Sequence, residues 1–519
     1  MVYLKIVLMA FIVSLSNAYK ILVVFPIPGA SHSILGQGYV NLLLKAGHEV
    51  TYVTPIFMQN PPANLRQINV TDNFQVFAQG DYFDIEKLLR KEVDLKDIHT
   101  LFKLMYTVSK STLINKNIQK LLNDPKEEFD VVIAEWMFNE IYSGFAGVYG
   151  CPLIWSSSVE PHQMVLSLID EAPNPAYSTN ALLASGDVPP FTFMQRVSKL
   201  WEFVTARFYK WWVTGVETEI YESGFRSAAL KRGRVLLPFS EAKYNASLML
   251  GNSHVSLGQA IRLPQNYIPI AGYHIDSNIA PLPEDLQKIM DNAKHGVIYF
   301  SLGTMLQSSK LPQSIKAGVL DVFRELKQTV IWKFEEQLPN RPQNVHIVRW
   351  APQQSILAHP NCVLFITHGG LLSTTETIYW GIPVIGMPMF ADQFNNVDTA
   401  VHKGFAKRVD LDLETPANLK AAINDILGNP RYRERVKELS FVYHDRPVPP
   451  SKELVHWVEH VVKTRGAPHL RSPALDVPWY QKMYLDLLVC IMALLFTLHI
   501  IVKKLICNRS SVTTEKKRS

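Results

Sequence analysis

The chain has 519 residues, of which 47% are hydrophobic and 19% are charged. That length exceeds what one hydrophobic core usually serves, so it predicts two domains. The formal net charge is +6, but Lys5 and the basic tail from Lys503 onward account for it. Residues 19–502 are therefore close to neutral, which argues against a nucleic-acid-binding protein and predicts no nucleic-acid partner.

The N-terminus has the pattern of a secretory signal peptide. Lys5 precedes an apolar run from Ile6 to Leu15, and Ser16-Asn17-Ala18 offers small residues for cleavage. The run is too short to cross a bilayer. We therefore exclude residues 1–18 from the fold.

The first domain, residues 19–265, is predicted to hold a parallel α/β sheet. A helix over 35–46, closed by Gly47, separates the first two apolar runs. A strand, a helix and a strand in series form a βαβ unit. The runs that we expect to form strands are 20–25, 49–54, 130–134 and 152–155.

One helical segment of this domain, residues 194–217, differs in composition from the rest. Its aromatic side chains alternate with basic ones, which is typical of a helix that lies in a membrane interface. Packing of the helix onto the first domain is the alternative, and the one we favour. The residues concerned are Trp201, Phe203, Phe208, Tyr209, Trp211 and Trp212, with Lys199, Arg207 and Lys210.

The pattern restarts near residue 296 and predicts a second α/β domain over residues 266–478, ending in return helices. Helices over 312–327 and 371–380 separate its strands, and the proline-rich segment 264–283 is the expected hinge. Parallel sheets bind ligands at the carboxyl ends of their strands, so we expect the active site in the cleft between the two sheets. The predicted strands are 297–302, 329–334, 346–350, 362–367 and 383–387.

A single membrane-spanning helix is predicted over residues 479–502. Its apolar run, 483–502, is long enough for a hydrocarbon core of about 30 Å at about 1.5 Å per residue. Aromatic residues precede the run and basic residues follow it, which predicts a lumenal body and a cytosolic tail over residues 503–519. We therefore expect a single-pass type I membrane protein.

Three short motifs are typical of the secretory route. The end of the chain, Lys516-Lys517-Arg518-Ser519, resembles the dilysine retrieval signal of the endoplasmic reticulum. Asn69-Val-Thr and Asn245-Ala-Ser are acceptor sequences for N-glycosylation. The chain is thus expected to be a glycoprotein of the endoplasmic reticulum membrane.

The cysteines do not have the pattern of a disulfide framework. Cys151 and Cys362 would be lumenal, Cys490 lies in the predicted membrane helix, and Cys507 lies beside it. No spacing of Cys and His residues suggests a metal site, so no metal is expected.

The strongest local signal runs from Phe365 to Glu376. A strand ends at Thr367, His368 and two glycines follow, and a helix begins. Free N–H groups at a helix N-terminus hold phosphate, and glycines let the backbone approach a diphosphate closely. His368 is placed to hydrogen-bond a phosphate oxygen, and Glu376 to reach ribose hydroxyls. Two glycines before a helix are by themselves often structural.

The wider sequence resembles the UDP-glycosyltransferases, the family that includes the UDP-glucuronosyltransferases. The resemblance covers about residues 20–500 and implies the GT-B fold, in which two Rossmann-like domains face a cleft. The Leu-Leu-Ser-Thr form of the phosphate loop resembles invertebrate members. The matching segments are Phe300-Ser-Leu-Gly-Thr304, Trp350-Ala-Pro-Gln-Gln-Ser-Ile-Leu-Ala-His-Pro360, Thr367-His-Gly-Gly370, Trp380-Gly-Ile-Pro383, Pro388-Met-Phe-Ala-Asp-Gln393 and Asp445-Arg-Pro-Val448.

The resemblance implies that the second domain binds the UDP-sugar. Trp350 is expected to stack on uracil and Gln353 to hydrogen-bond its edge. Without the resemblance, Trp350 could be a core residue, and Asp392 with Gln393 could be a helix N-cap. The other implied contacts are Ser301, Gly303 and Thr304 along the diphosphate, His368, Gly370 and Ser373 on phosphate, Glu376 on the ribose, and Asp392 and Gln393 on the sugar hydroxyls.

The acceptor side needs a base, because an inverting transfer deprotonates the acceptor as it attacks the anomeric carbon opposite UDP. Histidine suits this task near neutral pH. The resemblance implies that the base is His32, in the loop 28–33 after the first strand. The family orients this histidine with an Asp, where this chain has Glu135, one methylene longer. Glu135 either serves His32 in a rearranged or weaker pair, or is a solvent-exposed residue of an impaired enzyme.

The donor is expected to be UDP-glucose, as a co-substrate and without any cofactor. A glucuronate carboxylate would need a cationic partner. Family members that use glucuronate place an Arg where this chain has Gly251, and no Arg or Lys lies between Lys243 and Arg262. The aromatic-rich first domain suggests small lipophilic alcohols or phenols as acceptors.

Two other functions remain open at this point. A UDP-sugar-binding pseudoenzyme with weak or no transferase activity would result if Glu135 cannot serve His32. A lumenal membrane receptor without chemistry is supported by the predicted anchor alone. The sequence leaves open whether the chain forms a homo-oligomer.

Overall fold

The computed structural model describes residues 18–79, 98–178, 187, 189–276, 278–304 and 308–515. It divides into two compact units, of which unit 1 ends at Arg471 and unit 2 begins at Ser472. Of the predicted signal peptide only Ala18 is described, and the predicted dilysine signal lies outside the described residues.

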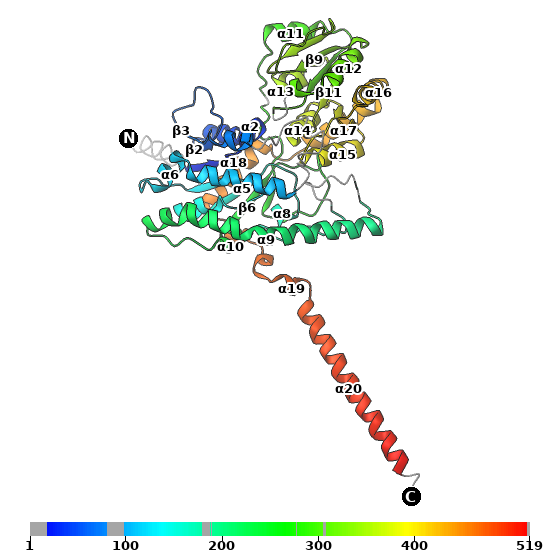
Figure 1. Cartoon of the computed structure of the whole chain (residues 1–519). Coiled ribbons are helices and arrows are strands. Elements are labelled where there is room, and N and C mark those ends of the chain that lie inside the picture. The colour runs from blue at the N-terminus through cyan, green and yellow to red at the C-terminus, as the bar shows by residue number, and fades with distance from the viewer. Residues whose placement is uncertain are drawn as a thin grey trace, which may run out of the picture. The chain divides into compact units, whose positions relative to one another are not determined.

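Unit 1 is built on two parallel sheets, which define a first lobe and a second lobe (Figure 1). This confirms the two α/β halves predicted from the sequence. The first sheet has seven strands, in the order β3 (Leu65–Asn69), β2 (Glu49–Thr54), β1 (Lys20–Val24), β4 (Val131–Trp136), β5 (Leu153–Ser157), β6 (Ala246–Gly251) and β7 (Tyr267–Pro269). The second has six, in the order β10 (Val345–Val348), β9 (Thr329–Lys333), β8 (Val297–Ser301), β11 (Cys362–Thr367), β12 (Val384–Gly386) and β13 (Ala406–Arg408).

Helices connect these strands and cover the sheets. Those in the first part of the chain are α2 (Ala30–Lys45), α3 (Asn73–Gln79), α5 (Ile98–Ile114), α6 (Lys116–Asn123), α7 (Ser143–Tyr149), α8 (Gln163–Leu166), α9 (Phe193–Lys231) and α10 (Phe239–Ala242). Those that follow are α11 (Glu284–Asp291), α12 (Gln313–Arg324), α13 (Gln353–Ala358), α14 (Leu371–Trp380), α15 (Gln393–His402), α16 (Thr415–Gly428), α17 (Arg431–His444) and α18 (Pro450–Lys463).

Side chains alternate between the two faces of the first sheet, and both faces are buried. Leu22 and Val24 of β1 belong to a core that includes residues of α5 and α9. Ile21 and Val23 belong to a second core, which includes residues of α2 and α18. Burial on both faces explains why these strands are uninterrupted apolar runs in the sequence.

The chain passes between the two lobes twice. Strand β7 pairs with β6, with Ile268 opposite Leu250, so the first sheet extends beyond the predicted domain boundary at residues 265 and 266. Strand β7 continues the sheet past this boundary because its residue Ile268 is buried in the core of the first lobe. After the second lobe, α18 returns and packs Leu454 and Val458 into the core of the first lobe.

Helix α9 is longer than predicted and packs on the first lobe, where it contacts α5 and α7. The sequence left open a basic, aromatic face on this helix, but two of the lysines concerned point inward. Lys199 is buried beside Asp187 and Glu202. Lys210 lies 2.7 Å from Glu140 and 2.5 Å from Glu217. Lys210 turns inward because the buried carboxylates of Glu140 and Glu217 need a compensating charge.

Unit 2 contains α19 (Trp479–Lys482) and α20 (Leu485–Glu515). Within the described residues, one helix is long and apolar enough to cross a membrane, and its apolar part is Leu485–Ile506. This continuous helix begins six residues after the start of the predicted span of 479–502, because α19 and a turn at Tyr484, with φ of 55°, precede it.

The ion cluster of Lys210, Glu140 and Glu217 gives a stability prediction. Burial acts to lower the pKa of Lys210, but the two carboxylates raise it overall. Lys210→Met would remove the cation that is paired directly with two neighbouring buried carboxylates and leave only the weaker influence of Lys243, so we expect a loss of about 3 kcal/mol in the free energy of unfolding. Urea unfolding of the detergent-solubilised protein measures this loss.

Arg207→Met is the matched control, because Arg207 lies on the exposed side of the same helix. We expect its effect to stay within about 0.5 kcal/mol. Equal stability of the Lys210 and Arg207 variants would show that the cluster contributes little.

Candidate active site

A cavity of about 560 Å³ lies between the two lobes. His32 and Ser158 of the first lobe line it, and all the predicted donor-binding residues of the second lobe line it too. The carboxyl ends of the parallel strands in both sheets supply these residues. The predicted residues that meet here are His32, Ser301, Gly303, Thr304, Trp350, Gln353, His368, Gly370, Ser373, Glu376, Asp392 and Gln393.

The phosphate-binding motif forms the expected strand, glycine turn and helix. Strand β11 ends at Thr367, and Gly369 has a φ of +79°, which favours glycine. Gly370 caps α14 without any side-chain hydrogen bond to the first turn. The free N–H groups of that turn lie beside the cavity and suit an anion.

The imidazole of His368 is held between two glycines. A Cβ atom on Gly303 would lie 2.8 Å from His368 Cε1, and one on Gly370 would lie 2.7 Å from His368 Nε2. Larger residues at either position would displace the ring. Burial, with a smaller effect from Lys333, lowers the pKa of His368 to about 4, so the ring is neutral at physiological pH and offers one N–H group to a ligand.

Sequence analysis missed Lys333, the last residue of β9. Its Nζ donates a hydrogen bond to the carbonyl of Gly303 at 2.8 Å and lies 3.2 Å from Glu335 Oε1. Of the described residues that line the cavity, Lys333 is the only lysine or arginine. Its position at the carboxyl end of a predicted strand was the signal that could have identified it.

Gln353 and Glu376 are joined in one hydrogen-bond network. Gln353 Nε2 donates to Glu376 Oε2 at 2.6 Å and to Ser373 Oγ at 3.1 Å. Gln354 Nε2 donates to the other carboxylate oxygen of Glu376 at 3.1 Å, and His274 Nε2 lies 3.5 Å from that oxygen. Sequence analysis missed Gln354, which holds the Glu376 carboxylate at the cavity wall, and the nearby His274, whose ring makes no hydrogen bond to it among the described residues.

Of the structural roles that the sequence left open, that of Trp350 is wrong, whereas that of Asp392 is correct in position but lacks the capping bond. Trp350 is 64% exposed and lines the cavity, so it is not a core residue. Asp392 is the N-cap residue of α15 but makes no side-chain cap bond, and its Oδ2 accepts from Asn396 at 2.7 Å. Gln393 Oε1 accepts the N–H groups of Met389 and Phe390, which shapes the loop beside the cavity.

His32 lies in the first turn of α2, not in the predicted loop. The carbonyl of Gly29 accepts the N–H of Ser33 at 3.0 Å, so the helix begins at Ala30, five residues before the predicted start. The polar first turn lacks the apolar spacing from which the helix was predicted. The helical turn fixes the direction of the His32 side chain, which a loop would not.

The structure brings Glu135 directly to His32. Oε1 of Glu135 lies 2.5 Å from His32 Nδ1, and it also accepts Ser158 Oγ–H at 2.5 Å. Glu135 is 1% exposed, so the solvent-exposed alternative is wrong. Sequence analysis missed Ser158, which follows β5.

The His32 ring is basic for a buried imidazole. Burial acts to lower its pKa, but the charge and hydrogen bond of Glu135, and then the charge of Asp392, raise the pKa above its ordinary value. Because Nδ1 faces Glu135, Nε2 is the ring nitrogen available to a substrate. The arrangement can accept a proton at Nε2 and stabilise the imidazolium that results.

The wall that the first lobe contributes to the cavity is largely apolar. Residues of α3, α5 and the segment after β4 form this wall, to which the second lobe adds Phe390. Such a wall suits an apolar ligand group. Its members include Phe77, Leu101, Leu104, Met105, Met137 and Phe138.

The two predicted glycosylation sites differ in their surroundings. Asn245 is exposed between α10 and β6. Asn69 is half-buried at the end of β3, and its Oδ1 accepts the N–H of Thr71 at 2.8 Å. Glycosylation at either site remains a prediction.

Comparison with known proteins identifies the family. The family model described as "UDP-glucoronosyl and UDP-glucosyl transferase" matches residues 20–519. The chain belongs to the UDP-glycosyltransferase family. UDP-glucosyltransferase 2 of Dactylopius coccus is 32% identical to this chain, over 98% of each protein. UDP-glucuronosyltransferase 2B1 of Rattus norvegicus is 28% identical, over 94% of this chain and 93% of the rat protein. The chain is therefore a glycosyltransferase, and its substrates are a UDP-sugar and an acceptor.

Solved structures confirm the GT-B fold predicted from the sequence. A UDP-glucosyltransferase from Polygonum tinctorium matches with a TM-score of 0.55 and 14% identity, over 86% of this chain and 99% of the plant protein. The calicheamicin glycosyltransferase CalG4 matches with a TM-score of 0.53 and 17% identity, over 87% of this chain and 100% of CalG4. At these identities the comparison establishes the fold.

The glycine contact with His368 gives a prediction about UDP binding. Gly370 has a φ of −59°, which alanine adopts without strain, so Gly370→Ala acts mainly by displacing the His368 ring. Losing one hydrogen bond to a charged phosphate costs about 1.5–3 kcal/mol, so UDP affinity should fall about tenfold or more. Titration calorimetry with UDP measures this change.

Gly428→Ala is the matched control, because a Cβ atom at Gly428 would meet nothing within 4 Å. We expect this variant to bind UDP as the unmodified protein does. Unchanged UDP affinity in the Gly370 variant would remove His368 from the phosphate site.

Proposed function

We propose that this enzyme is an inverting transferase that moves glucose from UDP-glucose to small lipophilic acceptors, with His32 as the general base. In the proposed step, His32 Nε2 removes the proton of an acceptor hydroxyl. The acceptor oxygen forms a bond to the anomeric carbon, the bond from that carbon to the phosphate oxygen breaks, and UDP leaves with the electron pair.

The contact between His32 and Glu135 is the observation that carries this proposal. At 2.5 Å, the longer arm of Glu135 reaches the imidazole without any break in the first sheet. A buried carboxylate that holds Nδ1 also stabilises the imidazolium after proton transfer. The same contact argues against the pseudoenzyme hypothesis, which requires that Glu135 does not hold and polarise His32.

Stabilisation of the leaving UDP is assigned to the start of α14 together with His368 and Lys333. N–H groups at a helix start and a nearby ammonium stabilise developing negative charge. Trp350 and Gln353 are assigned to uracil, Glu376 to the ribose, and Asp392 with Gln393 to the sugar hydroxyls. These groups supply the electrostatic stabilisation, so the proposed transfer uses no metal or other cofactor.

Two features of the site, together with the name of one relative, support glucose as the transferred sugar. Lys333 hydrogen-bonds Gly303, beside the residues assigned to the diphosphate, so it is not placed to bind the sugar. Asp392 lines the same cavity as His32 and is assigned to the sugar, where its carboxylate would repel glucuronate and accept hydrogen bonds from hydroxyls. The relative from Dactylopius coccus is named as a UDP-glucosyltransferase.

A donor screen tests the choice of sugar. The purified protein is incubated with a panel of phenols and, in turn, UDP-glucose, UDP-glucuronate, UDP-galactose and UDP-N-acetylglucosamine. We expect product mainly with UDP-glucose. Comparable or faster transfer from UDP-glucuronate would contradict the electrostatic argument from Asp392.

The proposed site of action is the lumen of the endoplasmic reticulum. The apolar segment 485–506 would anchor the chain in the membrane as a single span. The basic residues after the span predict a cytosolic tail, which leaves unit 1 in the lumen. The predicted signal peptide, sequons and dilysine motif support this topology.

Replacement of the base should separate chemistry from nucleotide binding. His32→Ala removes proton transfer, which contributes about 10²–10⁴-fold, so we expect kcat to fall by at least about 10²-fold. UDP affinity should stay near normal, because the assigned UDP contacts lie in the second lobe. Steady-state kinetics and calorimetry measure the two quantities, and lost UDP binding would contradict this role.

Replacement of the carboxylate should change the pH dependence. His32 acts in its neutral form, so kcat/KM should decline as pH falls through its raised pKa. Glu135→Gln removes the charge that raises this pKa, so the acid limb should move to lower pH. The plateau rate should fall because the amide cannot stabilise the imidazolium. An acid limb at unchanged pH would show that Glu135 is not the partner of His32.

A further inference from the structure

Helix α9 has a large apolar face that the proposed reaction does not use. Exposed apolar side chains recur along it at intervals of three or four residues, which places them on one side of the helix. Trp201 and Trp211 are each 68% exposed, and Trp212 is 70% exposed. Val197, one turn before Trp201, is also exposed, as are Val204 and Phe208 between the tryptophans. An apolar face of this extent marks an interaction site on a protein surface.

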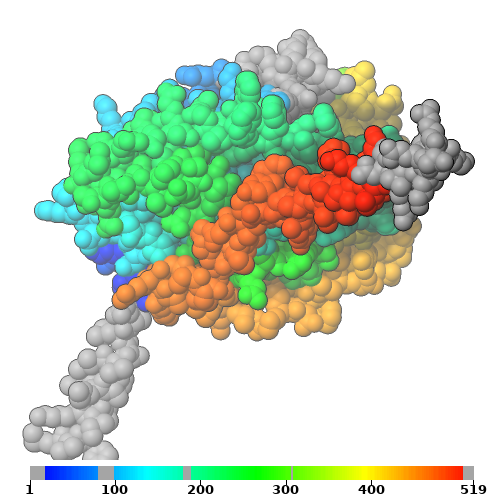
Figure 2. Space-filling model, turned by 90° about the horizontal axis from the view of Figure 1, so that it is seen from below, coloured from blue at the N-terminus to red at the C-terminus, as the bar shows by residue number. Residues whose placement is uncertain are grey.

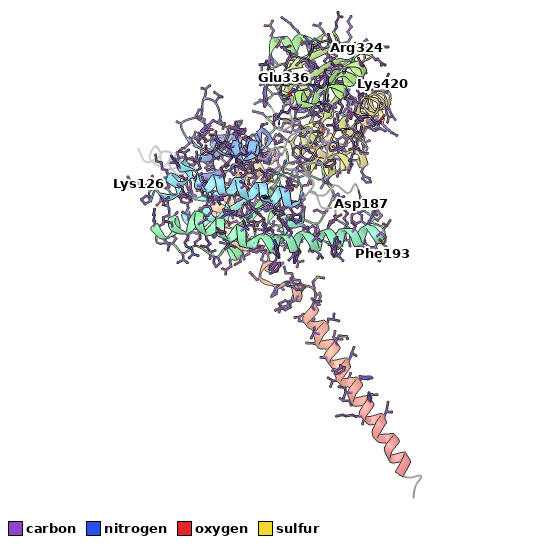
Figure 3. All side chains as sticks on the ribbon, viewed as in Figure 1. Lys126, Asp187, Phe193, Arg324, Glu336 and Lys420 are labelled. Atoms are coloured by element: carbon purple, nitrogen blue, oxygen red, sulfur yellow. The ribbon has the colours of Figure 1, made fainter. Side chains whose placement is uncertain are left out.

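The opposite side of the helix packs on the first lobe through buried residues that include Ala206 and Val213. The apolar face runs from Phe193 to Val216, which corresponds to about 36 Å of helix. Figure 2 shows side chains of α9 at the surface of unit 1, and Figure 3 marks Phe193 at the N-terminal end of the helix.

The charges around this face are arranged asymmetrically. Arg196 and Arg207 are exposed beside the apolar residues. Glu202 is only partly exposed and lies 3.2 Å from Lys199, while Glu217 is buried against Lys210. Within residues 192–218, all of which are described, no carboxylate side chain is exposed, and the first exposed carboxylate is that of Glu219, just beyond the C-terminal end of the apolar face. The face is therefore apolar, aromatic and flanked by cations.

We propose that this face of α9 docks on the phospholipid surface of the membrane, with its rings in the interfacial layer and its two arginines at the phosphate groups. Tryptophan favours this layer because its ring is apolar and its N–H group is polar. Helices with an apolar aromatic face and flanking cations lie in the plane of the interface. The inference rests on the proposed membrane anchor.

The course of the chain supports a lipid occupant. Unit 1 ends at Arg471, whose Nη1 donates to the carbonyl of Tyr244 at 3.3 Å. Tyr244 follows α10, which packs on α9 through the rings of Phe239 and Tyr221. The chain thus leaves unit 1 near α9. Residues 472–484 then precede the apolar span and, fully extended, reach at most about 45 Å, so unit 1 stays close to the bilayer.

A second copy of the chain fits this face less well. A symmetric dimer uses the same surface on both partners. It would therefore bring Arg196 and Arg207 of two chains onto one interface, with no exposed carboxylate of this face to pair them. Lipid phosphates supply the anions that such an interface would lack.

The test uses the full chain in phosphatidylcholine vesicles, with a site for a specific protease inserted within residues 472–478. Before cleavage, flotation with the vesicles tests the anchor. After cleavage, retention of unit 1 on the vesicles tests α9. Trp201→Glu with Trp211→Glu places charge in the proposed interface, and Leu413→Glu with Phe441→Glu is the control, at residues 83% and 71% exposed. UDP binding by calorimetry shows that each variant is folded.

We expect cleaved unit 1 to stay on the vesicles in the unmodified and control proteins. The tryptophan variant should be released, with retention at least about tenfold lower, since each 1.4 kcal/mol lost is a factor of ten. Equal release of all three proteins after cleavage would overturn docking through α9. Failure of the uncleaved chain to float would instead overturn the anchor. A released dimer that the tryptophan substitutions dissociate would assign the face to a second copy.

Discussion

The site depends on one constraint, the parallel direction of every described strand pair in both sheets. In a parallel sheet the carboxyl ends of neighbouring strands lie at the same edge. Polar residues that are far apart in the sequence therefore collect around one cavity without any local clustering in the chain. Those that follow or end strands are His32 after β1, Ser158 after β5, Lys333 at the end of β9, and His368 after β11.

Glu135, at the position where the resemblance implies an aspartate, is accommodated by its neighbours. The carboxylate is buried within the last residues of β4, opposite Ser156 of β5. Its Oε1 is shared by His32 and Ser158, while Oε2 has no hydrogen-bond partner among the described residues. A carboxylate with one shared and one uncompensated oxygen is costly unless it is matched by a positive charge. That cost favours the protonated form of His32, in agreement with its raised pKa.

The elements that were predicted with the correct bounds are those in which the apolar pattern and the residues at the ends of the element agree. Strands β2 and β11 and helix α14 have the predicted bounds, because a buried apolar run or a capped helix ends there at glycine or a polar residue. The edge strands β3 and β13 were missed, since Leu65–Asn69 and Ala406–Arg408 contain exposed polar residues and lack a continuous apolar run. The start of α2 was missed because a glycine carbonyl, not a side chain, sets it.

The candidate site was predicted in its composition but not in its pairings. The resemblance located His32 and the second-lobe residues, and the structure places them around one cavity. Contacts such as Ser158 with Glu135, or Lys333 with the Gly303 carbonyl, join segments that are distant in the sequence. They produce no periodic pattern of residues from which they could be predicted. The inward direction of Lys210 is of the same kind, because its partner Glu140 comes from another element.

The double passage of the chain between the lobes limits how they can move. One connection follows β7 and the other joins α17 to α18, and the hydroxyl of Tyr443 donates to the carbonyl of Ala271 at 2.8 Å. A Cβ atom on Gly272 would lie 1.6 Å from that hydroxyl, so the two connections touch. Because the two connections touch, any relative motion of the lobes would pivot close to this contact, as hinge motions do at a few residues at the ends of elements. The nucleotide would therefore enter through the opening between the two lobes, with Trp350 on one side and His32 on the other.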